Sequence, residues 1–235
     1  MKFVRLAIIF STMIQAASAA SCVLGTLSSY EALGAGGCSI GGTNFGSFAG
    51  LSGITGATAI APGSVTITPG GSLTTPMLTF TVSQTVRLGS LSEVIFTYQA
   101  SAMSFLLDKI SLSGSAETGN GAVTYTQNYC AGGVFGPDGV SGCSGSATGA
   151  LVTLDGIQNT DQIGLLGPKT LAITSDFVLD GGGTGTAAGG IFVDQFTTTT
   201  SAPEPSTYSL VFASVALLGV RRLRSARLRP NLFTR

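Results

Sequence analysis

Histidine is absent from this 235-residue sequence, and its absence excludes several kinds of catalytic and metal site. A Ser-His-Asp triad, a Cys-His dyad and a histidine-ligated metal all need at least one imidazole. A Gly-x-Ser-x-Gly motif occurs at 37–41, but no histidine exists to activate Ser39. Neither Lys109 nor Lys169 follows a glycine, as the lysine of a phosphate-binding loop does. A hydrolytic site would therefore have to rely on carboxylates alone.

Tryptophan is also missing, and charged residues amount to 9% of the chain, against about 25% in ordinary soluble domains. The exposed faces must then be built mainly from serine, threonine and glycine, as is common in extracellular β proteins. Without tryptophan, a carbohydrate site would depend on smaller aromatic side chains, such as Tyr125 and Tyr129. We expect these two tyrosines to pack in the core or at its rim.

The few charges are unevenly distributed along the chain. Residues 21–202 contain three basic and ten acidic side chains, a net charge of −7, whereas both ends of the chain are basic. Proteins that bind nucleic acid usually carry a basic patch, which this acidic segment lacks. We therefore expect no nucleic-acid partner. The segment is long enough for one domain with a sizeable core.

The N-terminus has the order of a secretory signal peptide. Two basic residues precede an apolar stretch at 6–14, and small residues follow it. We predict a signal peptide at 1–20, export by the Sec machinery, and cleavage after Ala19 or Ala20. An N-terminal membrane helix would need a longer apolar run. A lipoprotein acylated at Cys22 is a further alternative, but the usual leucine upstream of the cysteine is missing.

Four cysteines in an exported chain predict two disulfides. Of the three possible pairings we predict Cys22–Cys38 and Cys130–Cys143, because each closes a short segment rich in glycine and small residues. In the loop-entropy description each disulfide would stabilise the domain by about 3 kcal/mol. Zinc binding is the competing interpretation, but the chain contains no Cys-x-x-Cys motif and no histidine.

Segments in which apolar and polar residues alternate recur between turns rich in glycine and proline, a pattern typical of half-buried strands. They predict an all-β domain at 21–196: a two-sheet antiparallel β-sandwich of eight or nine short strands, with glycine-rich loops and no helix. The segment 102–113 is compatible with a helix, but its β-branched residues and serines favour a strand. The predicted strands lie at 45–49, 64–68, 77–88, 91–100, 102–113, 121–130, 150–155, 169–179 and 191–200.

The acidic residues could form two kinds of site, a calcium site or a pair of catalytic carboxyl groups. Asp138, Asp155 and Asp180 each precede a glycine in a predicted loop, and carboxylate oxygens suit calcium. Ordinary turn chemistry explains the same Asp-Gly steps, and we expect no other cofactor. A glycoside hydrolase would need two carboxyl groups roughly 5–9.5 Å apart in a cleft. Glu93 lies on one face of a predicted strand, where we expect it to be solvated.

The C-terminal part of the chain has three segments in a fixed order. After a Ser/Thr spacer at 197–202 come Pro203-Glu204-Pro205, an apolar run at 208–220 and a cluster of arginines. As a helix, the run would cover about 20 Å of a hydrocarbon core of roughly 30 Å, so it suits a temporary membrane stop better than a permanent anchor. The arginines stay on the cytoplasmic side and form the stop; they are Arg221, Arg222 and Arg224, followed by Arg227 and Arg229.

These features resemble the PEP-CTERM sorting domain of Gram-negative bacterial surface proteins, here at 203–229. The resemblance rests on Pro203, Glu204 and Pro205, the apolar run and the arginine-rich tail. It implies that an exosortase-like membrane enzyme recognises and removes the signal, so that the chain is held only transiently in the inner membrane before it reaches the cell envelope or the outside. One departure is the tail at 230–235, which follows the arginines. A plain tail anchor after a proline-rich linker is the alternative.

We therefore predict an exported structural or adhesive protein rather than an enzyme, and the resemblance adds an association with exopolysaccharide in a biofilm. A carbohydrate-binding module is the first alternative, which exposed aromatic side chains along one sheet face would support. A carboxylate-dependent glycoside hydrolase is the second, and it requires a cleft that holds two facing acids.

Overall fold

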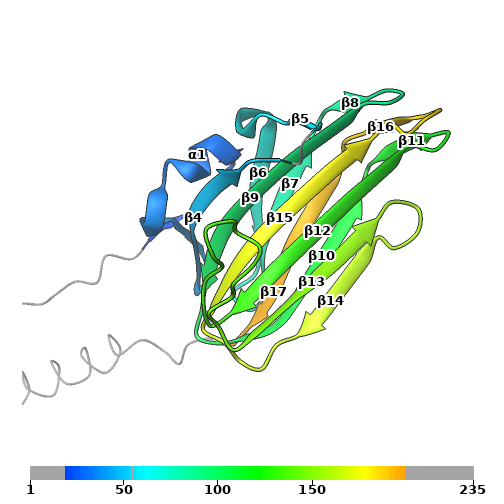
Figure 1. Cartoon of the computed structure of the whole chain (residues 1–235). Helices are drawn as coiled ribbons and strands as arrows, with labels where there is room; N and C mark the ends of the chain where they lie inside the picture. Colours follow the sequence, from blue (N-terminus) through cyan, green and yellow to red (C-terminus); the bar gives the residue numbers. More distant parts are fainter. Residues whose placement is uncertain (1–18, 54–55, 200–235) are drawn as a thin grey trace, which may run out of the picture.

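The computed structural model describes residues 19–53 and 56–199, which form several antiparallel sheets (Figure 1). The signal peptide predicted at 1–20, apart from its last two residues, lies outside the described residues, and so does the sorting signal predicted at 203–229. Within the described ranges, no helix is long and apolar enough to cross a bilayer.

Three sheets make up the described fold. Sheet A has the strand order β1-β3-β4-β9-β15-β12-β13, with β5 beside β9; sheet B has the order β14-β10-β17-β7-β6-β2; the end sheet has the order β11-β16-β8. The strands are β1 (Ala20–Ser21), β2 (Gly25–Thr26), β3 (Cys38–Ile40), β4 (Thr43–Leu51), β5 (Thr58–Ala59), β6 (Val65–Gly71), β7 (Pro76–Val82), β8 (Thr85–Val86), β9 (Leu91–Ser101), β10 (Phe105–Ser113), β11 (Ala116–Thr118), β12 (Ala122–Ala131), β13 (Ala147–Leu154), β14 (Thr160–Gly164), β15 (Thr170–Asp180), β16 (Thr186–Ala188) and β17 (Ile191–Thr198).

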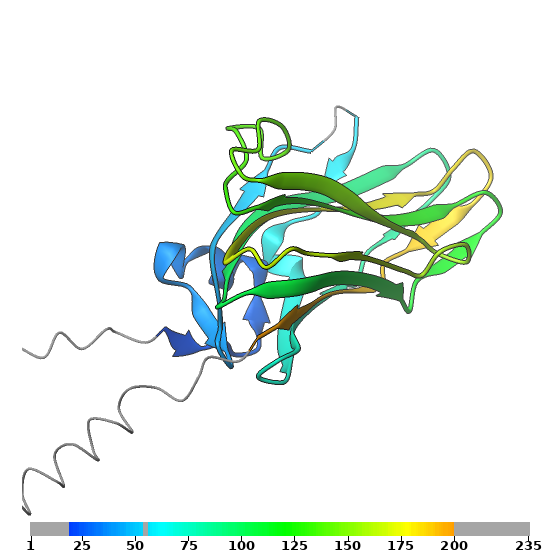
Figure 2. The ribbon, with the colours of Figure 1, turned by 90° about the horizontal axis from the view of Figure 1, so that it is seen from below.

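Sheets A and B lie face to face with the core between them, and the end sheet lies at one end of this sandwich (Figure 2). In β7 and β17, buried and half-buried residues alternate, as expected for strands with one wet face. Phe192 of sheet B stacks on Phe80 of the same sheet and on Phe177 of sheet A, with ring centroids 4.9 Å apart in both pairs. The all-β prediction is confirmed, although the described strands outnumber the predicted ones.

The prediction of one continuous strand at 77–88 is wrong. The chain forms β7 in sheet B and then β8 in the end sheet, where β8 pairs with β16. At the step between the two sheets, the Gly189 amide donates to the Gln84 carbonyl over 2.6 Å. The alternation of apolar and polar residues could not show where the chain passes from one sheet to the other, because it continues unchanged through both strands. The helical alternative for 102–113 is also wrong, since β10 turns Ile110 and Leu112 inward as every second residue.

The body of the chain also contains a short helix that was not predicted. Helix α1 (Leu27–Glu31) begins at Thr26, whose hydroxyl accepts a hydrogen bond from the Ser29 amide over 3.3 Å. It buries Leu27 and Tyr30, and the Tyr30 ring lies 5.1 Å from that of Phe48 in β4. Two 3₁₀ turns, η1 (Gly34–Gly36) and η2 (Pro62–Ser64), flank this region. Five residues are too few for helical periodicity to appear in a sequence.

The last strand continues into the segment predicted as a spacer. β17 ends at Thr198, so Thr197 and Thr198 of the predicted spacer at 197–202 belong to sheet B. The Thr198 amide donates to the Thr74 carbonyl (2.9 Å), and the Thr199 amide donates to the Ser104 carbonyl (3.1 Å). The chain thus leaves the sandwich at the end opposite the end sheet (Figure 1).

Candidate functional site

Both predicted disulfides are present. Cys22 is bonded to Cys38 and Cys130 to Cys143, and no cysteine in the described part of the chain is free. The first disulfide ties the residue after β1 to the start of β3. The second closes a loop between β12 and β13. Two disulfides indicate an oxidising, extracellular environment.

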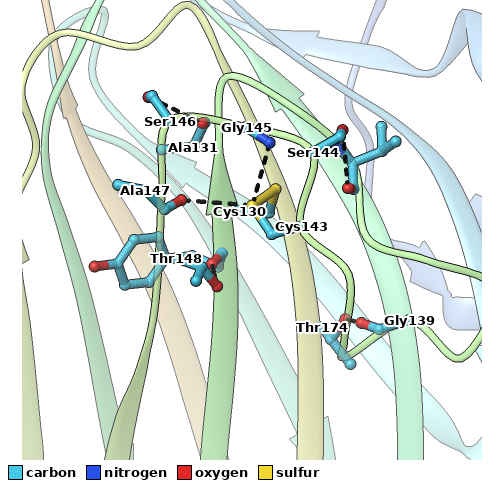
Figure 3. The surroundings of a disulfide bond; sticks show 12 residues. Cys130, Ala131, Gly139, Cys143, Ser144, Gly145, Ser146, Ala147, Thr148 and Thr174 are labelled. Carbon is cyan, nitrogen blue, oxygen red and sulfur yellow. Dashed lines mark hydrogen bonds between the residues drawn. A yellow bond between two sulfur atoms is a disulfide. The ribbon is translucent and has the colours of Figure 1, made fainter.

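The second disulfide shapes the loop at 132–146, which we call the disulfide loop (Figure 3). Where the loop returns to the sheet, the Ser146 amide donates to the Ala131 carbonyl over 2.8 Å. Farther out, the Thr174 hydroxyl of β15 donates to the Gly139 carbonyl at the tip of the loop. The disulfide loop therefore folds back over the outer face of sheet A.

A groove lies between the disulfide loop and β4, with a cavity of about 280 Å³. Ser47, Thr97 and Gln99 are polar residues along its sheet side, and Phe135 and Pro137 line it from the disulfide loop. None of the lining residues is Asp, Glu, Lys or Arg. The groove can therefore offer hydrogen bonds and apolar contacts to a small neutral group, but it holds no acid–base pair for catalysis.

Ser47 gives β4 an irregular path beside this groove. It has φ 56°, the one positive φ outside glycine among the described residues, and the pairing with β9 shifts between Gly46 and Ala49. In a regular strand, Phe45 and Phe48 would point to opposite faces, because they are three residues apart. The bulge lets both rings enter the core, and Phe48 stacks on Tyr98 with centroids 5.1 Å apart. The strained backbone thus has a packing cause, and it also shapes the groove.

A polar network lies in the core between sheets A and B. Asp194 of sheet B accepts a hydrogen bond from the Tyr98 hydroxyl over 2.5 Å and another from the Tyr125 hydroxyl. Burial raises the pKa of Asp194 to about 6, although the hydrogen bonds from Tyr125 and Tyr98 lower it. Burial, and then the charge of Asp194, raises the pKa of both phenols well above their ordinary value.

A second carboxyl group completes this network. The Gln127 side-chain amide of sheet A donates to Asp108 of sheet B over 2.8 Å. Burial and the neighbouring Asp194 raise the pKa of Asp108 well above its ordinary value, against the lowering effect of Gln127. Sequence reasoning missed both carboxyls as network members. A signal was available, since Asp108 is in phase with Ile110, and Asp194 is in phase with Phe192 and Phe196.

A second pair of acids, Glu93 and Asp176, lies on the outer face of sheet A, beside β5. The prediction that Glu93 is solvated is wrong: only 1% of its surface is exposed, because β5 pairs alongside it and Gly53 lies against its carboxyl group. Asp176 shares a hydrogen bond with Glu93. Burial, and then the charge of Glu93, raises the pKa of Asp176 to about 7. Two carboxyl groups that are hydrogen-bonded to each other lie closer together than the two catalytic acids of a glycosidase.

The residues weighed for calcium do not gather. Asp138 accepts hydrogen bonds from the Ser141 hydroxyl and amide and from a further loop amide, which hold its pKa below the usual value. Asp180 accepts a hydrogen bond from the Gly182 amide over 2.8 Å, and Asp155 directly follows the last residue of β13. Among the described residues, no three His, Cys, Asp or Glu side chains form a group that could hold a metal ion. Asp138 and Asp180 thus serve as turn residues.

The aromatic residues weighed for sugar stacking pack inside. Tyr125 is fully buried, and Tyr129 is 8% exposed, so the core-packing interpretation is confirmed for both. The strand phenylalanines Phe80, Phe96 and Phe177 are buried as well. Among the groove residues, the aromatic ring that the disulfide loop supplies is Phe135. Pro203, Glu204, Pro205 and the stop arginines lie outside the described residues.

Comparison with protein-family models gives no match, and comparisons with curated proteins and with solved structures give none either.

The raised carboxyl pKa values predict that acid stabilises this domain. A carboxyl whose folded-state pKa exceeds its unfolded value contributes stability that is complete below the unfolded pKa and is lost as the pH rises through the folded pKa. For Asp176 and Asp194 this window runs from the ordinary value of 3.8 to about 7 and about 6. We expect the thermal unfolding midpoint, followed by circular dichroism, to be higher at about pH 5 than at about pH 8.

The variant Asp176→Asn should reduce this difference, because the amide keeps the shape of the carboxyl group but does not titrate. Asp108 and Asp194 should leave part of it in place. Asp155→Asn, at a half-buried hairpin position, is the control and should retain the full difference. A wild-type midpoint that is equal or higher at the alkaline pH would contradict the prediction.

Proposed function

We propose that this chain is an exported structural or adhesive protein of the cell envelope or extracellular matrix, sorted by an exosortase-type membrane enzyme. The observation that carries the proposal is the order of parts. A disulfide-tied, acidic sandwich ends at Thr198, and the Pro-Glu-Pro, apolar and arginine segments follow within a few residues. Such an order fits a folded body that is exported first and released from its membrane signal afterwards.

The state of the carboxyl groups supports a non-catalytic role. Asp108 and Asp194 are fully buried between the sheets, where no substrate can reach them. Glu93 and Asp176 are hydrogen-bonded to each other beside β5. The carboxylate-dependent hydrolase needs two separated acids in a cleft, and the groove has none. Adhesion needs only a shaped surface.

The groove suits a neutral sugar residue of an exopolysaccharide, and we propose this as the ligand to which the domain adheres. The proposal thereby comes close to the carbohydrate-binding alternative. Its lining combines hydroxyl and amide groups of Thr97 and Gln99 with the ring of Phe135. A sugar can form hydrogen bonds to these polar groups through its hydroxyls, and it can pack a C–H face against the aromatic ring. An acidic ligand would gain no ion pair in this groove, because no lysine or arginine lines it.

The sorting proposal is tested by replacing Pro203, Glu204 and Pro205 with alanine in the native host. Mass spectrometry of the envelope fraction should find wild-type protein that lacks the stop arginines, and the variant should remain full-length in the membrane fraction. Pro230→Ala is the control, because it changes the same residue type outside the motif, and it should be processed normally. Recovery of native envelope protein with its arginines intact would contradict the proposal.

The adhesion proposal is tested at the groove. Phe135→Ala should weaken binding to exopolysaccharide from the native host by roughly three- to tenfold, because an aromatic face contributes about 1 kcal/mol beyond its area. Binding can be measured by retention on immobilised polysaccharide. Val140→Ala is the control: Val140 belongs to the same loop and is 49% exposed, but it does not line the groove. Equal binding by wild type and Phe135→Ala, or equal loss in both variants, would contradict the proposal.

A further inference from the structure

Three adjacent connections lie at the end of the sandwich from which the chain leaves. The backbone of Thr198 and Thr199 is hydrogen-bonded to the β6–β7 turn and to the β9–β10 turn. The β14–β15 connection lies beside the second of these, because the Phe105 amide donates to the Pro168 carbonyl (2.9 Å) and the Leu165 amide donates to the Leu106 carbonyl (2.9 Å). We call this surface, made by 72–75, 102–106 and 165–169, the exit end.

The exit end exposes large apolar side chains from each of its three connections. Leu166 is fully exposed, Leu73 is 65% exposed, Met103 is 54% exposed and Leu106 is 46% exposed. A single exposed leucine is ordinary, but a group that comes together from separate turns marks an interaction surface. Removing such side chains from water into an apolar layer is favourable.

The distribution of charged residues also favours the exit end as an interaction surface. The exit end contains no aspartate or glutamate, and its one charged residue is Lys169. Three carboxylates lie toward the opposite end: Glu117 is in the end sheet, Asp180 ends β15, and Asp155 directly follows β13. In a body with a net charge of −7, this leaves the exit end as the part that a negatively charged surface repels least.

The chain that follows brings this end close to the membrane. Residues 200–207 separate the last described residue from the apolar run at 208–220. Eight residues span at most about 30 Å even when fully extended. Once the run is in the bilayer, the exit end stays within that distance of the lipid headgroups, and a weak contact is enough for it to dock, because docking is then intramolecular.

We propose that the exit end rests on the phospholipid surface while the C-terminal run holds the chain in the membrane, with Leu73, Met103 and Leu166 inserted among the headgroups. The proposal rests on the transient anchoring proposed above. It orients the domain upright, with the end sheet pointing away from the bilayer. Removal of the signal then releases the domain, since three side chains without the tether hold a protein to a membrane only weakly.

The absence of tryptophan allows a direct test with single-tryptophan variants. Leu166→Trp and Ile157→Trp place the reporter just after and just before β14, at opposite ends of the sandwich, and Ile157 is itself 80% exposed. The full chain, with its C-terminal run, is reconstituted into phosphatidylcholine–phosphatidylglycerol vesicles that carry a nitroxide quencher near the headgroups. We expect the L166W variant to show a blue-shifted emission and quenching by the labelled lipid, and the I157W variant to show neither. Met103→Trp, from a different turn, should repeat the L166W result.

Each other outcome overturns the inference in a different way. If the chain floats with the vesicles but the L166W and M103W variants are unquenched, the anchoring holds and the docking does not occur. Equal quenching of the L166W and I157W variants means that the domain has no preferred orientation. A blue shift of the L166W variant without vesicles that grows with protein concentration shows that a second copy, not lipid, covers the exit end. If the chain does not float with the vesicles, the proposed anchoring fails as well.

Discussion

One buried carboxylate joins the two sheets of this protein at the centre of their interface. Asp194 comes from sheet B, and the two hydroxyls that bind it, from Tyr98 and Tyr125, come from sheet A. A carboxylate in such a place is costly unless its oxygens are satisfied, and hydrogen bonds to a charged group contribute about 1.5–3 kcal/mol each. Apolar packing brings the sheets together without choosing a register. The network of Asp194, with Gln127 and Asp108 beside it, restricts how the two faces can slide.

This arrangement leaves the outside of the sandwich with little chemistry. The large rings are used inside, where Phe80, Phe96, Phe177 and Phe192 pack against one another. The outer faces therefore consist mainly of small polar residues, and the grooves and protrusions on them are formed by loops. The disulfide loop supplies the groove, and the turns beside Thr198 supply the exposed apolar end. Both features suit the contact role proposed above, in which an exported body adheres to its surroundings.

Local patterns predicted a large part of this fold. Alternation identified the long strands, and short glycine-rich spacing identified both disulfide pairs. The features that these local patterns could not predict depend on contacts between segments that are distant in the sequence. The burial of Glu93 depends on β5 pairing beside it, and the bulge at Ser47 depends on a core that accepts both Phe45 and Phe48. The groove was equally hidden, because it exists only after the disulfide loop has folded back onto Thr174.

A double-mutant cycle between Asp194 and Tyr98 tests most directly whether the buried carboxylate joins the sheets. The free energy of unfolding in urea is measured for the wild type, Asp194→Asn, Tyr98→Phe and the double variant. If the carboxylate bridges the sheets, each single change destabilises the domain, and the two changes together cost less than their sum by about 1–3 kcal/mol. Additive effects, within about 0.5 kcal/mol, would contradict this account, because they would mean that the two side chains stabilise the sandwich independently.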